Sequence, residues 1–244
     1  MSKGIYKIFI KLSKILSRKG IYEFLDKEYA AIKKGNRVLS VGAGGDINFL
    51  LMKYAKNNEF EVITIDINKD RNPDIIGDVC VYDFGDMVFD IVVMGEVLEH
   101  LHSPHAAIEN IYRSMKTDGR LIMTAPFIFP IHERPCDYFR YTRYGLEYLL
   151  GSFEEVNINE RNGWGEAVNV LFVRHVMEKN ISSRLIAPLF ILLAFICLPF
   201  TVLLGKLIRT DFITSGYLVS AKKPSGRAPA QISKNAQLRN YSQR

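Results

Sequence analysis

The first twenty residues alternate apolar and basic positions with the period of an α-helix. Apolar side chains recur three and four residues apart from Ile5 to Leu16, and Lys7, Lys11, Lys14 and Arg18 share the opposite face. This pattern predicts a basic amphipathic helix over residues 1–20, of the kind that lies in the headgroup region of a bilayer. The competing interpretation is a helix that packs on its own domain. No apolar run here exceeds three residues, so we expect no signal peptide.

From residue 36 onward, short apolar runs typical of buried strands alternate with helical periodicity. Helices are predicted over 47–56 and 105–115, and strands over 37–41, 61–65, 89–94, 121–124, 153–158 and 216–221. Such alternation predicts an α/β fold, a parallel sheet with helices on both faces. Ligands of these sheets bind beyond the carboxyl ends of the strands. The glycines at 42–45, together with Asp66, Asp78 and Glu96, fall at that edge.

The glycine loop after the first strand allows a ligand to approach the backbone closely. A dinucleotide-binding loop requires a sixth-position glycine, and Ile47 stands there instead. Asp66, at the end of the next strand, can bind both hydroxyls of a ribose. The loop therefore predicts a nucleoside ligand without a pyrophosphate, the alternative being glycines that serve the turn alone.

Charge is distributed unevenly along this chain of net charge +6. Residues 1–22 and 222–244 each carry six basic residues and no acid, which leaves 23–221 with 20 basic and 26 acidic residues, a net charge of −6. We therefore expect an anionic membrane surface as partner of the basic ends, and no nucleic acid. The three cysteines lie far apart, which excludes a disulfide framework and suits a reducing compartment.

An uncharged apolar block covers residues 185–205 and is interrupted by Pro188 and Pro199. Strands are predicted on both sides of it, and if these two strands are neighbours in one sheet, the block is an insertion, residues 161–212, in a domain formed by 21–160 and 213–223. Both ends of the block must then return to the same side of a membrane. The prolines favour two short helices bent into a hairpin within one leaflet, and the alternative is an apolar helical pair that covers the domain or forms a dimer. Residues 224–244 are predicted to be a disordered basic tail.

Five segments in order carry a resemblance to a known family: VLSVGAGGD (38–46), ITIDIN (63–68), GDVCVYD (77–83), FDIVVMGEVLEHL (89–101) and KTDGRLIMTAP (116–126). Together they resemble the class I S-adenosylmethionine-dependent methyltransferases, in the branch that acts on small molecules. The resemblance implies a Rossmann-like seven-stranded sheet and S-adenosylmethionine as cofactor. It departs from the family's pattern at Ser40, where an acid is usual, and at Asp46, where a third glycine is usual.

The resemblance also implies a role for each matching residue. Gly42, Ala43 and Gly44 would line the methionine part of the cofactor, and Asp66 would bind the ribose hydroxyls. Asp78 and Val79 would edge the adenine, and Glu96 would lie beside the sulfonium.

The loop after the fifth strand, PFIFPIHERPCDYFRYTRYGLEYLL (126–150), is where this fold builds its acceptor site. It resembles the H-E-x-P-x-D-Y-x-R-x-T loop of methyltransferases associated with cell-surface glycan synthesis. A sugar hydroxyl is a poor nucleophile, and a base helps by about 10²–10⁴-fold. His132 is the first candidate base and Asp137 or Glu133 the second; Tyr138, Arg140 and Thr142 are candidate substrate-binding residues. Alternatively, an Asp137–Arg140 pair pins the loop and Thr142 caps the next helix.

The sequence thus predicts a methyltransferase on the cytoplasmic face of a membrane that O-methylates a glycan or lipid-linked saccharide. A methyltransferase for a lipid-soluble small molecule such as a quinone precursor is the first alternative. A non-catalytic cofactor-binding module that anchors partner enzymes is the second. His100, His102 and His105 form an H-x-H-x-x-H pattern, but no carboxylate partner is evident in the sequence, and no metal is expected. The oligomeric state stays open.

Overall fold

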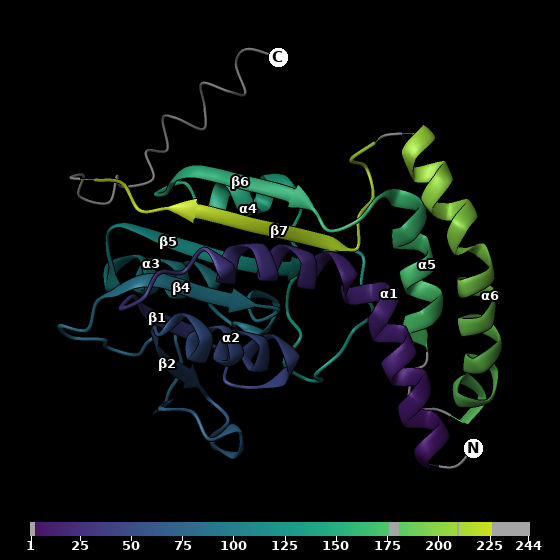
Figure 1. Ribbon diagram of the computed structural model, residues 1–244, viewed down its shortest axis with the longest axis horizontal. Coiled ribbons are helices and arrows are strands. Elements are labelled where there is room, and N and C mark those ends of the chain that lie inside the picture. The colour runs from purple at the N-terminus through teal and green to yellow at the C-terminus, as the bar shows by residue number, and fades with distance from the viewer. Residues whose placement is uncertain (1–2, 176–180, 209, 226–244) are drawn as a thin grey trace.

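The computed structural model describes residues 3–175, 181–208 and 210–225, and contains a seven-stranded mixed sheet in the order β3-β2-β1-β4-β5-β7-β6 (Figure 1). The strands are β1 (Arg37–Val41), β2 (Glu61–Asp66), β3 (Ile75–Ile76), β4 (Phe89–Gly95), β5 (Met115–Pro126), β6 (Glu154–Glu160) and β7 (Gly216–Lys222). β7 runs antiparallel to β5 and β6, while β1 to β5 pair in parallel. The predicted fold class is confirmed, including the adjacency of the last two strands.

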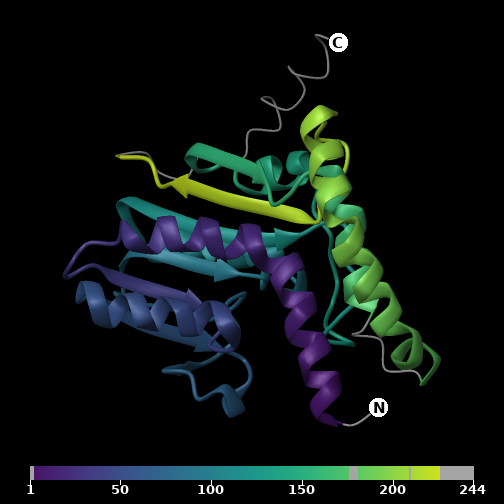
Figure 2. The ribbon, with the colours of Figure 1, turned by 45° about the vertical axis from the view of Figure 1, so that its right-hand side comes forward.

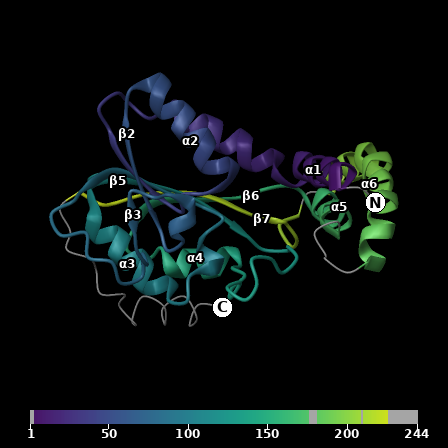
Figure 3. The ribbon, with the colours of Figure 1, turned by 90° about the horizontal axis from the view of Figure 1, so that it is seen from below.

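Helices cover both faces of the sheet (Figure 3). One face is covered by α2 (Gly45–Asn58) and part of α1 (Lys3–Ala30), and the other by α3 (Pro104–Ser114) and α4 (Arg143–Leu149). Two further helices, α5 (Trp164–Arg174) and α6 (Ile181–Leu207), lie to the side of the sheet (Figure 3). Because side chains alternate along a strand, β4 sends Val92 and Met94 into the core beneath α3 and α4 and Val93 into the core beneath α1 and α2. Both sides of the central strands are therefore buried, which explains their continuous apolar runs.

α1 continues past the predicted end near residue 20, and its two halves have different neighbours. Ile21, Leu25 and Tyr29 are buried against the sheet. In the N-terminal half, Ser13 and Ser17 are buried on the side that faces α5 and α6. Gly20 lies between the halves, so close to the backbone of Arg161 that a Cβ would stand 2.2 Å from its carbonyl oxygen. The second half thus packs on the chain's own domain.

α5 and α6 stand beside the N-terminal half of α1, beyond the carboxyl ends of the parallel strands (Figures 1 and 2). They run antiparallel: Gly165 meets Thr201, the Asn169 amide donates to the Ala194 carbonyl at 2.8 Å, and further along α5 the Phe172 ring stacks on α6. α1 closes the group against α6 through partly buried apolar residues such as Phe9 and Leu16.

The expectation of two short helices bent into a hairpin within 185–205 is wrong. α6 is one helix of 27 residues that contains both Pro188 and Pro199. A proline removes one backbone hydrogen bond, and a neighbouring helix can hold the chain across that gap. Here Asn169 of α5 donates to the Ala194 carbonyl, five residues before Pro199, so α5 holds α6 close to the gap. The predicted basic tail, from residue 226 on, lies outside the described residues.

Among the described residues, α6 is the one helix with the length and apolar composition of a membrane span, from Leu185 to Leu207. Only 17% of its most apolar 18-residue window is buried in the protein. An exposed stripe follows the helical spacing along the whole element, formed by Leu185, Leu189, Leu192, Ile196, Phe200, Leu203 and Leu207.

Candidate active site

A cavity of about 520 Å³ opens at the carboxyl ends of β1, β2 and β4. The glycine loop forms one wall and the loop that follows β5 forms the other. Among the residues predicted to bind a cofactor, Gly42, Gly44, Asp66, Asp78, Val79 and Glu96 line it, as do His132, Glu133 and Tyr138 from the predicted acceptor loop. Ala43 contributes its backbone N–H to Asp66 at 2.9 Å. The topology thus brings two segments about ninety residues apart onto one cavity.

The Asp66 carboxylate is buried at the end of β2 and held in a fixed orientation. One oxygen accepts the Asn68 N–H at 2.8 Å, and the other accepts the Ala43 N–H at 2.9 Å and the Arg71 guanidinium at 3.1 Å. Arg71 also lies over Gly44, where a Cβ would stand 2.8 Å from its side chain. The Arg71 side chain is part-exposed, so a ligand with two hydroxyls can displace it from Asp66.

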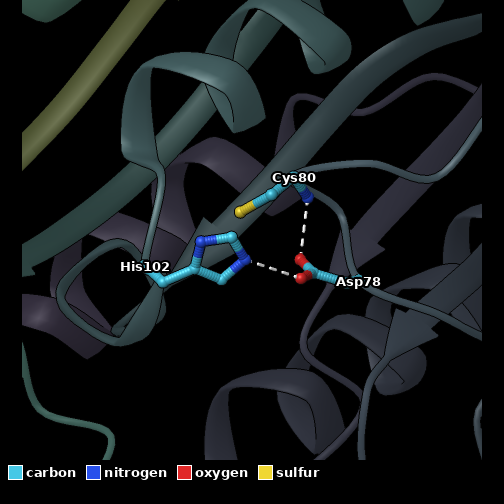
Figure 4. A group of neighbouring side chains, drawn as sticks. All are labelled: Asp78, Cys80 and His102. Atoms are coloured by element: carbon cyan, nitrogen blue, oxygen red, sulfur yellow. Dashed lines mark hydrogen bonds and ion pairs between the residues drawn. The ribbon is translucent and has the colours of Figure 1, made fainter.

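Asp78 lies further along the same cavity, beside His102 and Cys80 (Figure 4). Its carboxylate accepts the Cys80 N–H at 2.9 Å and meets Nε2 of His102 at 2.9 Å. Burial would raise the pKa of Asp78, but these two hydrogen bonds outweigh it and lower the pKa. Burial raises the pKa of the Cys80 thiol to about 11, so it stays protonated. Asp78 is thus a charged acceptor at the end of the cavity predicted for adenine.

Glu96, between β4 and the acceptor side, has a left-handed backbone conformation with φ of 55°. Strain of this kind in a residue other than glycine concentrates at functional sites. Its carboxylate accepts hydrogen bonds from Thr124 and from the buried guanidinium of Arg161. Burial would raise the pKa of Glu96, but the charges of Arg161 and Arg18 outweigh it and lower the pKa. Glu96 therefore stays ionised in the wall of the cavity.

His132 is the acceptor-loop residue with the densest surroundings. Its Nδ1 lies 3.3 Å from the Pro130 carbonyl and 3.4 Å from Asp137, and its Nε2 lies 3.6 Å from the buried carboxylate of Glu99. Burial would lower the pKa of His132, but the nearby carboxylates of Glu99 and Asp137 outweigh it, so the pKa is raised. Burial raises the pKa of Glu99.

Asp137 has partners that do not fit its predicted role as a base. Its side chain is 2% exposed, and both oxygens accept hydrogen bonds from Arg140 while one also accepts the His132 N–H at 2.8 Å. Burial would raise the pKa of Asp137, but Arg140 and these hydrogen bonds lower it to about 2. The pair pins the loop, as the alternative interpretation of the sequence holds.

Arg140 and Thr142 lie off the cavity, contrary to their predicted role in binding substrate. The Arg140 guanidinium donates hydrogen bonds to Asp137 and to backbone carbonyls of its own loop. The Thr142 hydroxyl accepts the Gly145 N–H at 3.0 Å and caps α4. Tyr138 is the predicted substrate-binding residue that does reach the cavity.

Several residues of the site lie outside the sequence predictions. Arg18 lines the cavity from α1, and Lys14 beside it donates to Asp46 at 2.6 Å. Part of the basic face of α1 therefore serves the protein itself. Arg161 and Glu99 are both buried, and the sequence predictions include neither. Arg161 pairs with Glu96, 65 residues away in the sequence, and no local pattern predicts a buried ion pair across that separation. The three histidines of the H-x-H-x-x-H pattern turn to separate partners, Cys136, Asp78 and Tyr148.

Comparisons with known proteins point to one family. A family model described as a methyltransferase domain matches residues 15–159. Among solved structures, phosphoethanolamine N-methyltransferase 2 of Haemonchus contortus in complex with S-adenosyl-L-methionine aligns with a TM-score of 0.58 at 14% identity, over 85% of this chain and 53% of that one. The chain therefore spans about half the length of that enzyme. No curated protein matches.

Two further structures share the fold. The [4+2]-cyclase SpnF aligns with a TM-score of 0.54 at 17% identity, over 88% of this chain and 82% of that one. A putative methyltransferase in complex with the Haloferax volcanii Trm112 activator aligns with a TM-score of 0.53 at 14% identity, over 90% and 97% of the two chains. Identities this low establish the shared fold alone.

Proposed function

Because the chain belongs to the methyltransferase-domain family, whose class I members use S-adenosylmethionine, we propose that it O-methylates a glycan or lipid-linked saccharide at a membrane surface. One juxtaposition carries the proposal: a loop rich in polar and aromatic groups closes the cofactor cavity, and the exposed apolar helix α6 belongs to the helix group beside it.

The cavity residues fit this cofactor. Asp66 presents a buried carboxylate whose one side-chain partner, Arg71, is part-exposed, and Asp78 offers a charged acceptor at the other end. When bound, S-adenosylmethionine supplies a methyl group on a sulfonium, whose carbon–sulfur bond breaks as the acceptor oxygen bonds to the methyl carbon, leaving a neutral thioether. The ionised Glu96 lies between the two walls, where a carboxylate favours a positive charge.

The acceptor end offers two groups that can take a hydroxyl proton, His132 and Glu133. Holding the acceptor oxygen in line supplies most of the acceleration, because effective molarities in oriented reactions are large. Tyr138 offers an exposed ring at the same end, and aromatic faces suit the apolar face of a sugar. The Asp137–Arg140 pair holds His132 in place, because Asp137 also accepts the His132 backbone N–H.

The membrane part of the proposal rests on α6 and on the exposed basic residues of α1. The exposed apolar residues of α6 form one continuous stripe, and contiguous apolar patches mark sites of protein or membrane contact. Lys7 and Lys11 are exposed, and each basic residue near an anionic surface contributes about 1 kcal/mol. A short chain of contacts links these helices to the acceptor loop: Arg174 of α5 lies over the Phe129 ring, which meets His132 edge-on. A lipid-linked acceptor held in the membrane beside these helices would therefore have only a short distance to extend to the acceptor loop.

The activity is tested with detergent-purified protein, methyl-labelled S-adenosylmethionine and fractionated extracts of the source cells. We expect label in a glycan or polar-lipid fraction. Asp66→Ala should abolish labelling, and Asp70→Ala, an exposed neighbouring acid outside the cavity, should not. Label that enters a quinone-type lipid instead would favour the lipid-soluble acceptor. Cofactor binding with no label in any fraction would overturn the proposal in favour of the anchoring module.

Membrane contact is tested by flotation with vesicles that contain or lack anionic lipid. Leu192→Glu with Ile196→Glu should reduce flotation, because both side chains belong to the exposed stripe of α6. The matched control is Ile76→Glu with Val81→Glu, two equally exposed apolar residues near β3. Equal flotation of both double variants would refute the role of α6. For the cytoplasmic face, a tag at the C-terminus should resist external protease in sealed cells.

A further inference from the structure

Glu99 is the most conspicuous buried polar group of the acceptor side. Its side chain is 0% exposed, and among the described residues neither carboxylate oxygen has a hydrogen-bond partner. A buried carboxylate without hydrogen bonds costs several kcal/mol, so native structures rarely keep one without a function. Its backbone carbonyl accepts the N–H groups of Tyr138 and Phe139, which fixes the acceptor loop directly over it.

Two imidazoles converge on this carboxylate from different segments. Nε2 of His100 and Nε2 of His132 each lie 3.6 Å from the same Glu99 oxygen, and the two rings meet edge-on with centroids 4.8 Å apart. His100 comes from the turn Leu98–His100 and His132 from the acceptor loop. Both histidines line the cavity, so the cluster lies between the buried carboxylate and the space for a ligand.

Each ring is turned by a hydrogen bond on its far side. Nδ1 of His100 donates to the Cys136 carbonyl at 2.6 Å, and Nδ1 of His132 donates to the Pro130 carbonyl at 3.3 Å. A proton fixed on Nδ1 leaves the Nε2 lone pair of each ring free, 3.6 Å from the Glu99 oxygen. Histidines that bind metals are oriented in this way, by a carbonyl or carboxylate behind the ring.

The separations also match a shared ion. Two donor atoms about 2.1 Å from one metal at a tetrahedral angle are about 3.4 Å apart, and the nitrogen–oxygen distances here are 3.6 Å, too long for hydrogen bonds. All three ligand atoms lie within 4.8 Å of one another. We propose that Glu99, His100 and His132 bind a divalent first-row transition metal ion at the acceptor end of the cavity.

Ligand chemistry and local charge select the kind of ion. Two imidazoles and a carboxylate suit Zn²⁺, Mn²⁺ or Fe²⁺, whereas Mg²⁺ favours oxygen ligands alone. The Arg140 guanidinium, one of the basic groups of this loop, is neutralised by both oxygens of Asp137. Among the described residues, a second group of possible ligands, Asp78, Cys80 and His102 (Figure 4), lacks these features: its carboxylate is already hydrogen-bonded and its thiol is protonated.

The ion would give the acceptor oxygen a binding position, and this role rests on the proposed function. A hydroxyl bound to a divalent cation loses its proton more readily. With His132 engaged as a ligand, that proton passes to the exposed Glu133 carboxylate and from there to water. Specificity would follow as well, because an acceptor with two adjacent oxygens can occupy two open positions of the ion.

The test is direct binding of Mn²⁺ and Zn²⁺ to the full chain, purified in detergent and stripped with a chelator. Mn²⁺ binding is followed by the loss of the free-ion electron paramagnetic resonance signal, and Zn²⁺ binding by competition with a chromogenic chelator. We expect one ion per chain. His100→Ala, His132→Ala and Glu99→Gln should each weaken affinity at least tenfold. The matched control is His105→Ala, whose ring contacts Tyr148 away from the cavity and which should leave affinity unchanged.

Binding of S-adenosylhomocysteine by each variant shows that it is folded, and the two single histidine variants suffice if Glu99→Gln fails this check. The proposal is overturned if the chain binds neither ion, or if the cluster variants bind as tightly as His105→Ala. Neither readout involves an acceptor, so failure of the labelling experiment leaves the metal site standing. Labelling that is unaffected by the chelator, in protein that does bind the ion, would refute the catalytic role alone.

Discussion

Replacing Arg161 with Met should destabilise the protein more than the loss of a surface ion pair. The Arg161 guanidinium is 1% exposed and donates to Glu96, itself largely buried. The side chain also fills the space over Gly216, where a Cβ would stand 2.7 Å from Nη2. Methionine keeps much of the volume but removes the charge and its hydrogen bonds, which leaves the Glu96 carboxylate buried with Thr124 as its remaining hydrogen-bond partner.

Removing one partner of a buried ion pair costs about 3–5 kcal/mol. For a chain of this length, each kcal/mol lowers the melting temperature by about 2–4 °C, so we expect a fall of about 6–20 °C. Arg113→Met is the matched control, because Arg113 pairs with Glu109 on the exposed face of α3. Exposed pairs of this kind contribute about 0.3–0.5 kcal/mol.

Thermal unfolding in mild detergent, followed by circular dichroism, measures both variants. Adding Glu96→Gln to Arg161→Met should restore about 2 kcal/mol or more, because the uncompensated charge disappears. Arg161 helps to hold the pKa of Glu96 below its ordinary 4.5, so the wild type loses this stability only as pH falls through the lower value. In the variant that pKa rises, and the deficit should shrink between pH 7 and 5. Equal melting temperatures for Arg161→Met and Arg113→Met would refute the reasoning.

Three further outcomes follow. Gly165→Leu should separate α5 from α6, because a Cβ there would stand 2.5 Å from the Thr201 carbonyl; loss of proteolytic resistance in the bundle, with S-adenosylhomocysteine binding retained, checks it. Thr142→Ala should cost about 1 kcal/mol in thermal unfolding and leave turnover unchanged, whereas a fall in turnover would restore its role in binding substrate. Asp137 has a pKa lowered to about 2, so the stability that its pair with Arg140 contributes persists above pH 4 and is lost as pH falls through 2; Asp137→Asn should melt lower than wild type at pH 6, with a gap that narrows towards pH 3.

The sequence by itself determined six of the seven strands and the edge that carries the site. The apolar runs at 37–41 and 89–95 are continuous because both faces of a central parallel strand are buried, and the glycines and Asp66 follow strand ends that must meet at one edge. The spacing of apolar residues and the residue types at turns depend on neighbours in the chain, so they can be read from the sequence alone.

Only the tertiary structure decided which distant residues meet. Pro199 predicts a break in an isolated helix, yet α6 continues across it because α5 packs alongside. Asp137 has the chemistry of a base until Arg140 occupies both its oxygens, and Glu99 has that of a surface acid until two histidines, one adjacent in sequence and one 33 residues away, enclose it. Ionisation and ligation depend on what surrounds a group within a few ångströms, and those surroundings come from segments that local sequence does not relate.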